Sequence, residues 1–226
     1  MVKIDLHVHT EHSPDSFASV KDVITMAKAR GLNGIAITDH NSISAIKEAQ
    51  KIAGKDFLII PGEEVESKEG HILAIGIIKL IKPKLSAKET IGEIHKQGGI
   101  AIAAHPYGFI AHHRSVGNLI KELDFDAVEV FNSLNMFENK KAIRIAEENK
   151  LVATVGSDAH QPEDIGNSYI KINCTLEVNT ILENIKKGTF IWCGKRTKLL
   201  TQIQRLTRVA YNFLTKNKTL DKCQHR

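Results

Sequence analysis

The chain has 226 residues, of which 42% are hydrophobic and 25% are charged, and its formal net charge is +5. This length allows one barrel-sized domain with a substantial core, and the composition is ordinary for a soluble globular protein. No apolar run approaches the roughly 18 residues that span a bilayer. The first residues already enter a predicted strand, which argues against a signal peptide. Three widely spaced cysteines without a Cys-x-x-Cys pair argue against a disulfide framework and favour a reducing cytoplasm.

The charge is unevenly distributed along the chain. Residues 195–226 contain nine lysines and arginines but one acid, so this segment carries +8 and residues 1–194 carry −3. Apolar residues recur in the basic segment at helical spacing, namely Leu199, Leu200, Ile203, Leu206, Val209, Ala210, Phe213 and Leu214. The pattern predicts an amphipathic helix, which either docks on the rest of the protein or contacts nucleic acid or a membrane surface.

Strand-like and helix-like segments alternate along most of the chain. In order, the pattern predicts strand Lys3–His9, helix Val20–Arg30, strand Gly34–His40, helix Ser42–Ala53, strands Phe57–Glu66 and His71–Ile78, helix Ser86–Gln97, strands Ile100–His105 and Ala127–Phe131, helix Met136–Asn149, strands Leu151–Gly156 and Ser168–Asn173, helix Glu177–Lys187 and strand Phe190–Cys193. Such alternation predicts a parallel sheet with right-handed crossovers. Polar residues follow most strands, which favours a closed barrel with a site at its mouth over an open sheet with one switch point.

Histidines and acids gather at the ends of these predicted strands. The segments are Asp5-Leu6-His7-Val8-His9-Thr10, Thr38-Asp39-His40, Pro61-Gly62-Glu63-Glu64, Gly70-His71, Ala104-His105-Pro106 and Gly156-Ser157-Asp158-Ala159-His160. Residues two apart on a strand share a face, so His7 and His9 could bind one metal ion, and Asp158 and His160 repeat this spacing. Imidazole and carboxylate together suit Zn²⁺, Mn²⁺ or Fe²⁺. The residues alone predict a multinuclear metallohydrolase, of either the phosphoesterase or the amidohydrolase kind.

The order and spacing of these segments resemble the successive motifs of the polymerase and histidinol phosphatase (PHP) family. The resemblance covers roughly residues 1–195 and leaves 196–226 as a basic amphipathic tail. It implies an α/β fold, a distorted (β/α)7 TIM-like barrel with a basic C-terminal helix. It also implies two or three divalent metal ions (Mn, Zn or Fe) and hydrolysis of phosphoesters.

The resemblance also implies a ligand set. The expected metal ligands are His7, His9, Asp15, His40, Glu64, His71, His105, Asp158 and His160. By position, His7, His9 and Asp158 would hold one ion, and Glu64 would bridge it to a second ion bound by His71 and His105. A third ion would lie among Asp15, His40 and His160. Without Asp15 the site would be dinuclear, and Glu63 is the alternative to Glu64.

The implied nucleophile is a metal-bridging hydroxide held by Glu64, Asp158 and His160, because divalent ions about 3.5–4 Å apart lower the pKa of a bridging water. Candidates for substrate binding follow His105 in the sequence, and these are Tyr107, His112, His113 and Arg114. Arg114 could bind a phosphate through two hydrogen bonds; the alternative is a solvated loop. Glu129 is expected either to support a ligand histidine from inside the barrel or to form a salt bridge between barrel and helix.

The expected function is a cytoplasmic, metal-dependent phosphoesterase. Its expected substrates are small phosphomonoesters, such as nucleotides with a 3′- or 5′-phosphate, or short oligonucleotides. One alternative is a histidinol-phosphate phosphatase. Another is a metal-binding module of nucleic-acid processing without catalytic activity, although the complete ligand set argues against it.

Overall fold

The computed structural model describes residues 1–108, 115–135, 138–198, 201–202 and 207. It divides into two compact units, Met1–Arg196 and Thr197–Arg226. In the second unit the described residues Thr201, Gln202 and Thr207 are helical. The rest of the predicted tail helix lies outside the described residues, as do three substrate-binding candidates, His112, His113 and Arg114. Among the described helices, none has the length and apolarity needed to cross a membrane.

The first unit is built on one sheet of nine strands. These are β1 (Val2–Val8), β2 (Gly34–Ile37), β3 (Leu58–Glu66), β4 (His71–Ile75), β5 (Ile100–Ala103), β6 (Ala127–Asn132), β7 (Ala153–Gly156), β8 (Ser168–Ile172) and β9 (Ile191–Gly194). Their order is β7-β6-β5-β4-β3-β2-β1-β8-β9. Strands β1, β2 and β3 pair in parallel, and so do β5, β6 and β7.

The predicted all-parallel sheet is wrong at two strands, β4 and β8, which run antiparallel to their neighbours. The connection between β3 and β4 is a tight turn in which the Ser67 hydroxyl bonds the Gly70 carbonyl. So short a connection can only return the chain as a hairpin, because a parallel crossover needs about a dozen residues or more.

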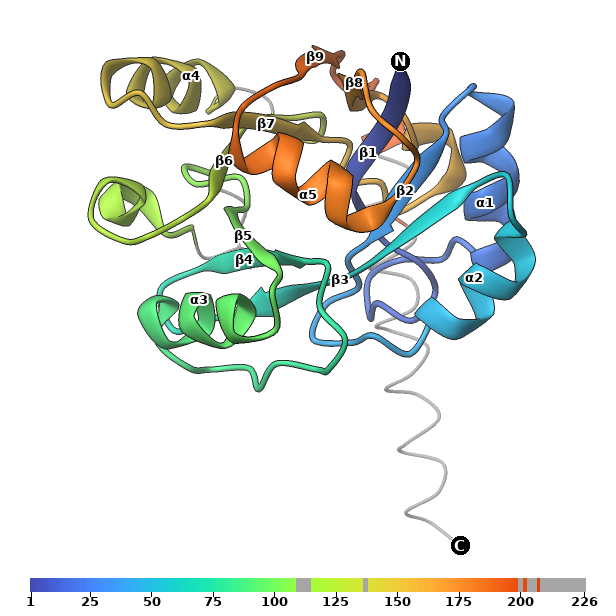
Figure 1. Cartoon of the computed structure of the whole chain (residues 1–226), viewed down its shortest axis with the longest axis horizontal. Helices are drawn as coiled ribbons and strands as arrows, with labels where there is room; N and C mark the ends of the chain where they lie inside the picture. The colour runs from blue at the N-terminus through green and yellow to red at the C-terminus, as the bar shows by residue number, and fades with distance from the viewer. Residues whose placement is uncertain (109–114, 136–137, 199–200, 203–206, 208–226) are drawn as a thin grey trace, which may run out of the picture. The chain divides into compact units, whose positions relative to one another are not determined.

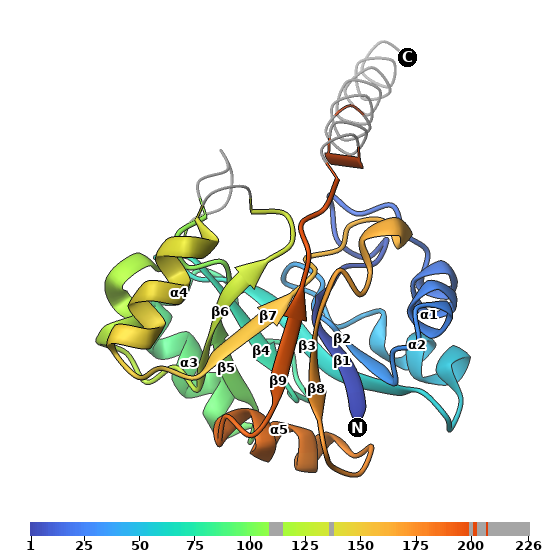
Figure 2. The ribbon, with the colours of Figure 1, turned by 90° about the horizontal axis from the view of Figure 1, so that it is seen from above.

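The sheet curls into a nearly closed barrel (Figure 2). Closure comes from the chain that follows β7, which lies beside β1. Asp158 N donates to the His7 carbonyl, and His9 N donates to the Ala159 carbonyl, each at 2.9 Å. The α/β fold and the TIM-like barrel expected from the sequence are therefore confirmed.

Five α-helices surround the sheet in the described part of the chain. They are α1 (Val20–Ala29), α2 (Ile46–Ala53), α3 (Ala87–Lys96), α4 (Asn139–Glu148) and α5 (Val178–Lys186). Figure 1 shows α1 and α2 on one side of the barrel and α3 and α4 on the other. Helix α5 lies across one end, where Ile181, Leu182 and Ile185 join the interior core with Ile4 and Leu6.

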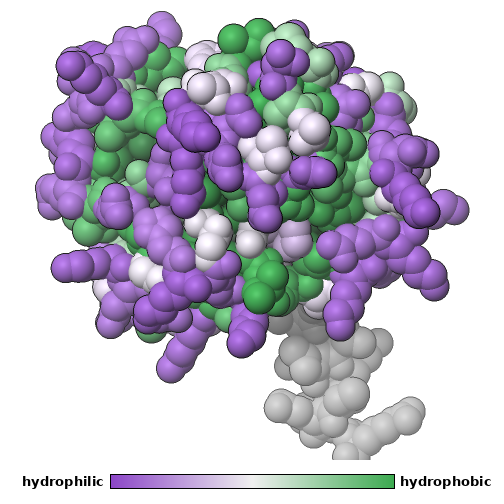
Figure 3. All heavy atoms as spheres, viewed as in Figure 1, coloured by the Kyte–Doolittle hydropathy of each residue, from purple (hydrophilic) through white to green (hydrophobic). Residues whose placement is uncertain are grey.

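Local sequence signals account for most helix ends. The helix predicted from Ser86 begins with a capping box, in which Ser86 and Glu89 bond each other's backbone N–H groups at the start of α3. The predicted start of α2 near Ser42 is wrong, because the helix begins at Ile46 without a side-chain cap. The Ser42 hydroxyl instead contacts the Ser44 hydroxyl at 2.8 Å, so it is not available as a cap. Polar residues dominate the surface between scattered hydrophobic ones (Figure 3), since the apolar side of each helix faces the sheet.

Candidate metal centre

All nine predicted ligands lie at one end of the barrel. His7 and His9 come from β1 and the residues after it, His40 follows β2, and Glu64 lies near the end of β3. Strand β4 runs in the opposite direction, so its first residue, His71, lies at this same end. The remaining ligands follow β5, β7 and β1, and they are His105, Asp158, His160 and Asp15. The barrel thus assembles side chains that are far apart in the sequence, as the mouth of a parallel barrel does.

The tightest group contains His7, His9, Glu64 and Asp158, whose ligand atoms all lie within 4.8 Å of one another. The Nε2 atoms of His7 and His9 are 3.1 Å apart, and each is 3.2 Å from Glu64 Oε2. Asp158 Oδ1 is 3.4 Å from His7 Nε2 and 3.3 Å from His9 Nε2. Four donor atoms thus surround one small volume.

Glu64 connects this group to the opposite side of the mouth. Its Oε2 faces His7, His9 and His40, and its Oε1 lies 2.9 Å from His71 Nδ1 and 3.0 Å from His105 Nε2. Its neighbour Glu63 points out of the cluster and accepts a hydrogen bond from Ile81 N at 2.9 Å. Of the two adjacent glutamates, only Glu64 therefore reaches the predicted ligands.

The third predicted group consists of Asp15, His40 and His160. Its members lie close together, but His40 is shared with other groups. Asp15 Oδ2 lies 2.9 Å from His160 Nε2 and 3.7 Å from His40 Nε2. His40 also lies within reach of two other groups, one with His9 and His160 and one with Glu64 and His71. The position of His40 thus leaves it between the second and third predicted ions.

Hydrogen bonds fix the orientation of three histidine rings. Nδ1 of His7 faces Glu129 Oε1 at 2.9 Å, and Nδ1 of His160 faces the Asp158 carbonyl at 2.8 Å. Because these oxygens only accept, both Nδ1 atoms carry the proton, and the Nε2 lone pairs point into the cluster. Nδ1 of His9 faces Ser13 Oγ at 2.9 Å. This arrangement is that of histidines prepared to bind metal through Nε2.

Two family models match the chain. The PHP domain matches residues 5–114, and the PHP-associated region matches residues 137–190. The uncharacterized protein MJ1587 of Methanocaldococcus jannaschii is 39% identical over 144 residues, which are 58% of this chain and 82% of that protein. The chain belongs to the PHP family.

Two further relatives extend the comparison. A 5′-3′ exoribonuclease of Haemophilus influenzae is 37% identical over 91 residues, 38% of this chain and 32% of that enzyme. A crystal structure from Bacteroides vulgatus, of a two-domain protein described as containing a predicted PHP-like metal-dependent phosphoesterase, has a TM-score of 0.68 at 20% identity. The superposed region covers 86% of this chain and 65% of that protein. This likeness confirms the PHP barrel.

The electrostatics of the candidate metal centre favour bound cations. Burial alone lowers the pKa of His9, but the Asp158 and Glu64 carboxylates raise it to about 9. Burial raises the pKa of Glu64, yet His40, His7 and His71 hold it well below its usual range. Asp15 Oδ1 is buried and has no hydrogen-bond partner among the described residues. Carboxylates and imidazoles gathered in one buried site fit bound divalent ions, which would take the place of a ring proton such as that on His9 Nε2.

Three acids outside the ligand set support its backbone and rings. Glu129 faces the barrel interior, so the first of its two predicted roles agrees with its contact to His7. Asp5 accepts from the backbone N of His7 and Ser157, and burial raises its pKa to about 6. Asp39 binds both the N and the hydroxyl of Thr10, at 2.6 and 2.7 Å. These carboxylates hold the strand ends that carry the ligands.

The sequence did not single out Ser13 or Asn132. Ser13 contacts His9 and also accepts from His40 N at 2.9 Å, and Asn132 donates to Asp158 Oδ2 at 3.1 Å. The available signal for Ser13 was its place two residues before the predicted ligand Asp15. Asn132 ends β6, and the predicted ligands likewise lie at or near the ends of strands.

Tyr107 is the one substrate-binding candidate that the described residues include. Its hydroxyl donates to Asn118 Oδ1 at 2.9 Å, and Lys141 Nζ lies 4.1 Å from the centre of its ring. The ring is partly exposed, and burial raises the pKa of its hydroxyl. Tyr107 follows His105 by two residues, and its ring packs against the apolar cluster that includes Ile120 and Ala142.

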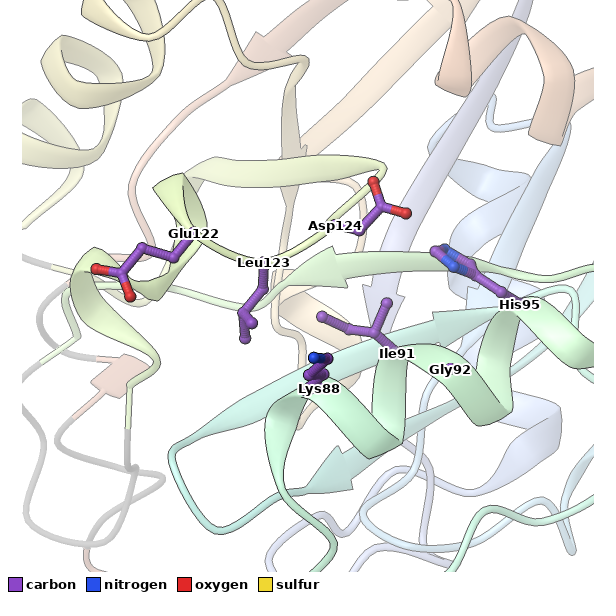
Figure 4. A pocket seen from close by; sticks show the side chains of 7 residues that line it. All are labelled: Lys88, Ile91, Gly92, His95, Glu122, Leu123 and Asp124. Atoms are coloured by element: carbon purple, nitrogen blue, oxygen red, sulfur yellow. The ribbon is translucent and has the colours of Figure 1, made fainter.

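A separate hollow of about 340 Å³ lies on the outside of the barrel (Figure 4). It is formed by α3 and the segment before β6, and its lining residues are Lys88, Ile91, Gly92, His95, Glu122, Leu123 and Asp124. This lining mixes Lys88 with two carboxylates, and His95 Nε2 is 2.8 Å from Asp126 Oδ2. None of the nine predicted ligands lines this hollow.

Proposed function

We propose that this PHP protein is a phosphoesterase that hydrolyses small phosphomonoesters or the phosphoesters of nucleotides and short oligonucleotides. The observation that carries the proposal is the convergence of five histidines on the two carboxylate oxygens of Glu64, namely His7, His9, His40, His71 and His105. The family relationship supports a metal-dependent phosphoesterase. The match to the 5′-3′ exoribonuclease supports a substrate with a nucleotide phosphate.

The residues would hold two or three divalent ions of manganese, zinc or iron. We assign His7, His9 and Asp158 to one ion, His71 and His105 to a second, and Asp15, His40 and His160 to a third, with Glu64 between the first two. When bound, such ions supply positive charge that activates a water nucleophile and neutralises phosphoryl oxygens. The contact of Asp15 with His160 supports the third ion.

The chain's own groups act by position and burial. We infer that Glu64, Asp158 and His160 orient the attacking water, so no serine or cysteine nucleophile is needed. His7, His9 and Glu64 are at most 1% exposed, which strengthens electrostatic interactions within the site. The side chains of Asp15 and His40 are 24% and 11% exposed, so a phosphate would approach on their side. Tyr107, His112, His113 and Arg114 are our candidates for holding the substrate. Of these, His112 and His113 are also candidates for protonating the leaving group.

Hydrolysis assays on the metal-stripped and reloaded full chain test this function. We expect Mn²⁺, Zn²⁺ or Fe²⁺ to restore turnover of p-nitrophenyl phosphate and of 3′- or 5′-nucleotides, with histidinol phosphate as the competing substrate. His9→Ala should abolish turnover, whereas His12→Ala should not, because His12 is a partly exposed neighbour bonded to Ser44. Metal binding without turnover of any phosphoester would instead indicate the binding module.

A further inference from the structure

Glu129 lies at the centre of a buried hydrogen-bond network beneath the metal ligands. It belongs to β6 and is 1% exposed. Its Oε1 accepts from His7 Nδ1 at 2.9 Å. Its Oε2 accepts from His105 N at 2.8 Å and from Asn132 Nδ2 at 3.0 Å. One carboxylate therefore contacts two predicted ligands directly.

Asn132 extends the network to a third ligand. Its Nδ2 donates to Asp158 Oδ2 at 3.1 Å as well as to Glu129. Asn132 is itself fixed, because its Oδ1 accepts from Leu134 N and its carbonyl accepts from Asn139 Nδ2, each at 2.9 Å. His7, His105 and Asp158 come from three separate parts of the chain, and Glu129 and Asn132 join them.

The backbone at two of these ligands needs such support. His105 has φ 27° and Asp158 has φ 54°, a left-handed region that a non-glycine residue rarely adopts. Conformations of this kind persist where surrounding contacts determine them. Glu129 accepts the backbone N–H of His105, and Asn132 holds the side chain of Asp158.

The carboxyl group of Glu129 contacts three nitrogen atoms at once. Three N–H donors, from His7, His105 and Asn132, converge on two oxygens, and only a carboxylate offers acceptors to all of them. The space around the Glu129 side chain is also tightly filled. A Cβ on Gly156 would lie 2.3 Å from Glu129 Oε1 and 2.4 Å from His7 Cβ. The packing at this point therefore depends on a glycine facing a glutamate and a histidine.

We propose that Glu129 is a positioning residue of the metal centre. It keeps the proton of His7 on Nδ1, so that Nε2 is free for an ion, and it sets His105 directly and Asp158 through Asn132. Mutation of a hydrogen-bond partner of a metal-binding histidine typically lowers the affinity for metal by about 10–100-fold, so we expect Glu129 to affect this affinity. The inference rests on the proposed function in one respect, namely that His7, His105 and Asp158 are ligands.

Glu129→Gln separates this role from simple filling of space. Glutamine has one acceptor oxygen and one amide donor in the same volume. If its oxygen faces His105 N and Asn132, its NH₂ group faces His7 Nδ1 and forces the proton onto Nε2. If the glutamine amide is flipped, its NH₂ group instead faces two other donors, His105 N and Asn132 Nδ2. Either orientation weakens metal binding.

Glu63→Gln is a matched control. Glu63 is also a fully buried strand glutamate, but it accepts a hydrogen bond from Ile81 N and points away from the ligands. The same exchange of a carboxyl group for an amide there should leave metal affinity unchanged. Asn132→Ala is a second probe, because it removes the arm to Asp158 and leaves the bond between Glu129 and His7.

The experiment is calorimetric titration of the metal-stripped full chain with Mn²⁺ and with Zn²⁺, with circular dichroism to verify folding. We expect about 10–100-fold weaker binding of one ion in Glu129→Gln, a smaller loss in Asn132→Ala, and none in Glu63→Gln. Wild-type affinity in a folded Glu129→Gln would overturn the inference, and so would an equal loss in Glu63→Gln. If Glu129→Gln does not fold, unchanged binding by Asn132→Ala overturns it. A wild type that binds neither ion would refute the metal centre itself.

Discussion

Ser13 Oγ lies 2.9 Å from His9 Nδ1 and also 2.9 Å from His40 N, so one hydroxyl joins two predicted ligands that are 31 residues apart in the sequence. The hydroxyl accepts from His40 N, and its hydrogen bond with His9 Nδ1 orients the ring so that Nε2 faces the cluster.

Ser13→Ala should therefore weaken metal binding while the barrel stays folded. We expect about 10–100-fold lower affinity for the ion at His9, because the ring loses the partner that fixes its orientation. Calorimetric titration with Mn²⁺ measures this loss. Ser44→Ala is the control, since Ser44 is an exposed serine that bonds His12 rather than a ligand. Equal affinities in both variants would refute the role of Ser13.

Gly156→Ala should disrupt both the fold and the site. The added methyl group would lie 2.3 Å from Glu129 Oε1 and 2.4 Å from His7 Cβ, and the second contact is with an atom close to the backbone. We expect a loss of roughly 1–3 kcal/mol in unfolding free energy, as for other overpacked interiors, measured by urea denaturation.

Gly92→Ala is the matched control for that prediction. Gly92 lies within α3, and no described atom lies within 4 Å of a Cβ placed there. Alanine in a helix interior is favoured over glycine by about 0.5–1 kcal/mol, so this variant should be more stable than the wild type. Similar destabilisation of both variants would show that the contacts around Gly156 are not the cause.

Much of this fold was predictable because barrel strands and their ends have local signals. Apolar runs that end in polar residues identified the strands, and Ser86 with Glu89 identified the start of α3. The short connection before β4 already indicated an antiparallel pair, whereas the direction of β8 was not predictable in the same way. Side-chain alternation reports the period of a strand, but its direction depends on which neighbour it pairs with.

The ligands were predictable for a different reason than the residues that hold them. The two-residue spacing of His7 and His9 on a strand is visible in the sequence, and the resemblance to the PHP family implied Glu64. Ser13 and Asn132 act through contacts that the fold creates; Asn132 and Asp158 are 26 residues apart and belong to different parts of the sheet. A serine or an asparagine at a loop or strand end is common, so its type alone does not indicate this role.

Asp15→Asn should distinguish two ions from three. Asp15 Oδ2 faces His160 Nε2 at 2.9 Å, and its Oδ1 is buried without a hydrogen-bond partner among the described residues. An amide is a weaker ligand for a divalent cation than a carboxylate, so we expect the variant to lose one ion and keep the others. Elemental analysis of the loaded protein counts the ions. Asp22→Asn, in the first turn of α1, is the control and should keep the wild-type count. A wild-type count of two, unchanged in Asp15→Asn, would favour a dinuclear site.

Glu63 should make stability depend on pH. Burial raises its pKa from the usual value near 4.5 to about 7, and the hydrogen bond from Ile81 N offsets only part of this rise. A carboxyl whose pKa is higher in the folded state binds its proton more tightly there, so its contribution is complete below about pH 4.5 and is lost as pH rises through about 7. Glu63→Gln keeps a neutral group at every pH. We therefore expect the variant to gain stability relative to the wild type between pH 5 and pH 8, by about 2 kcal/mol. Urea unfolding of both metal-free proteins at several pH values measures the difference, and a difference that does not change with pH would contradict the raised pKa.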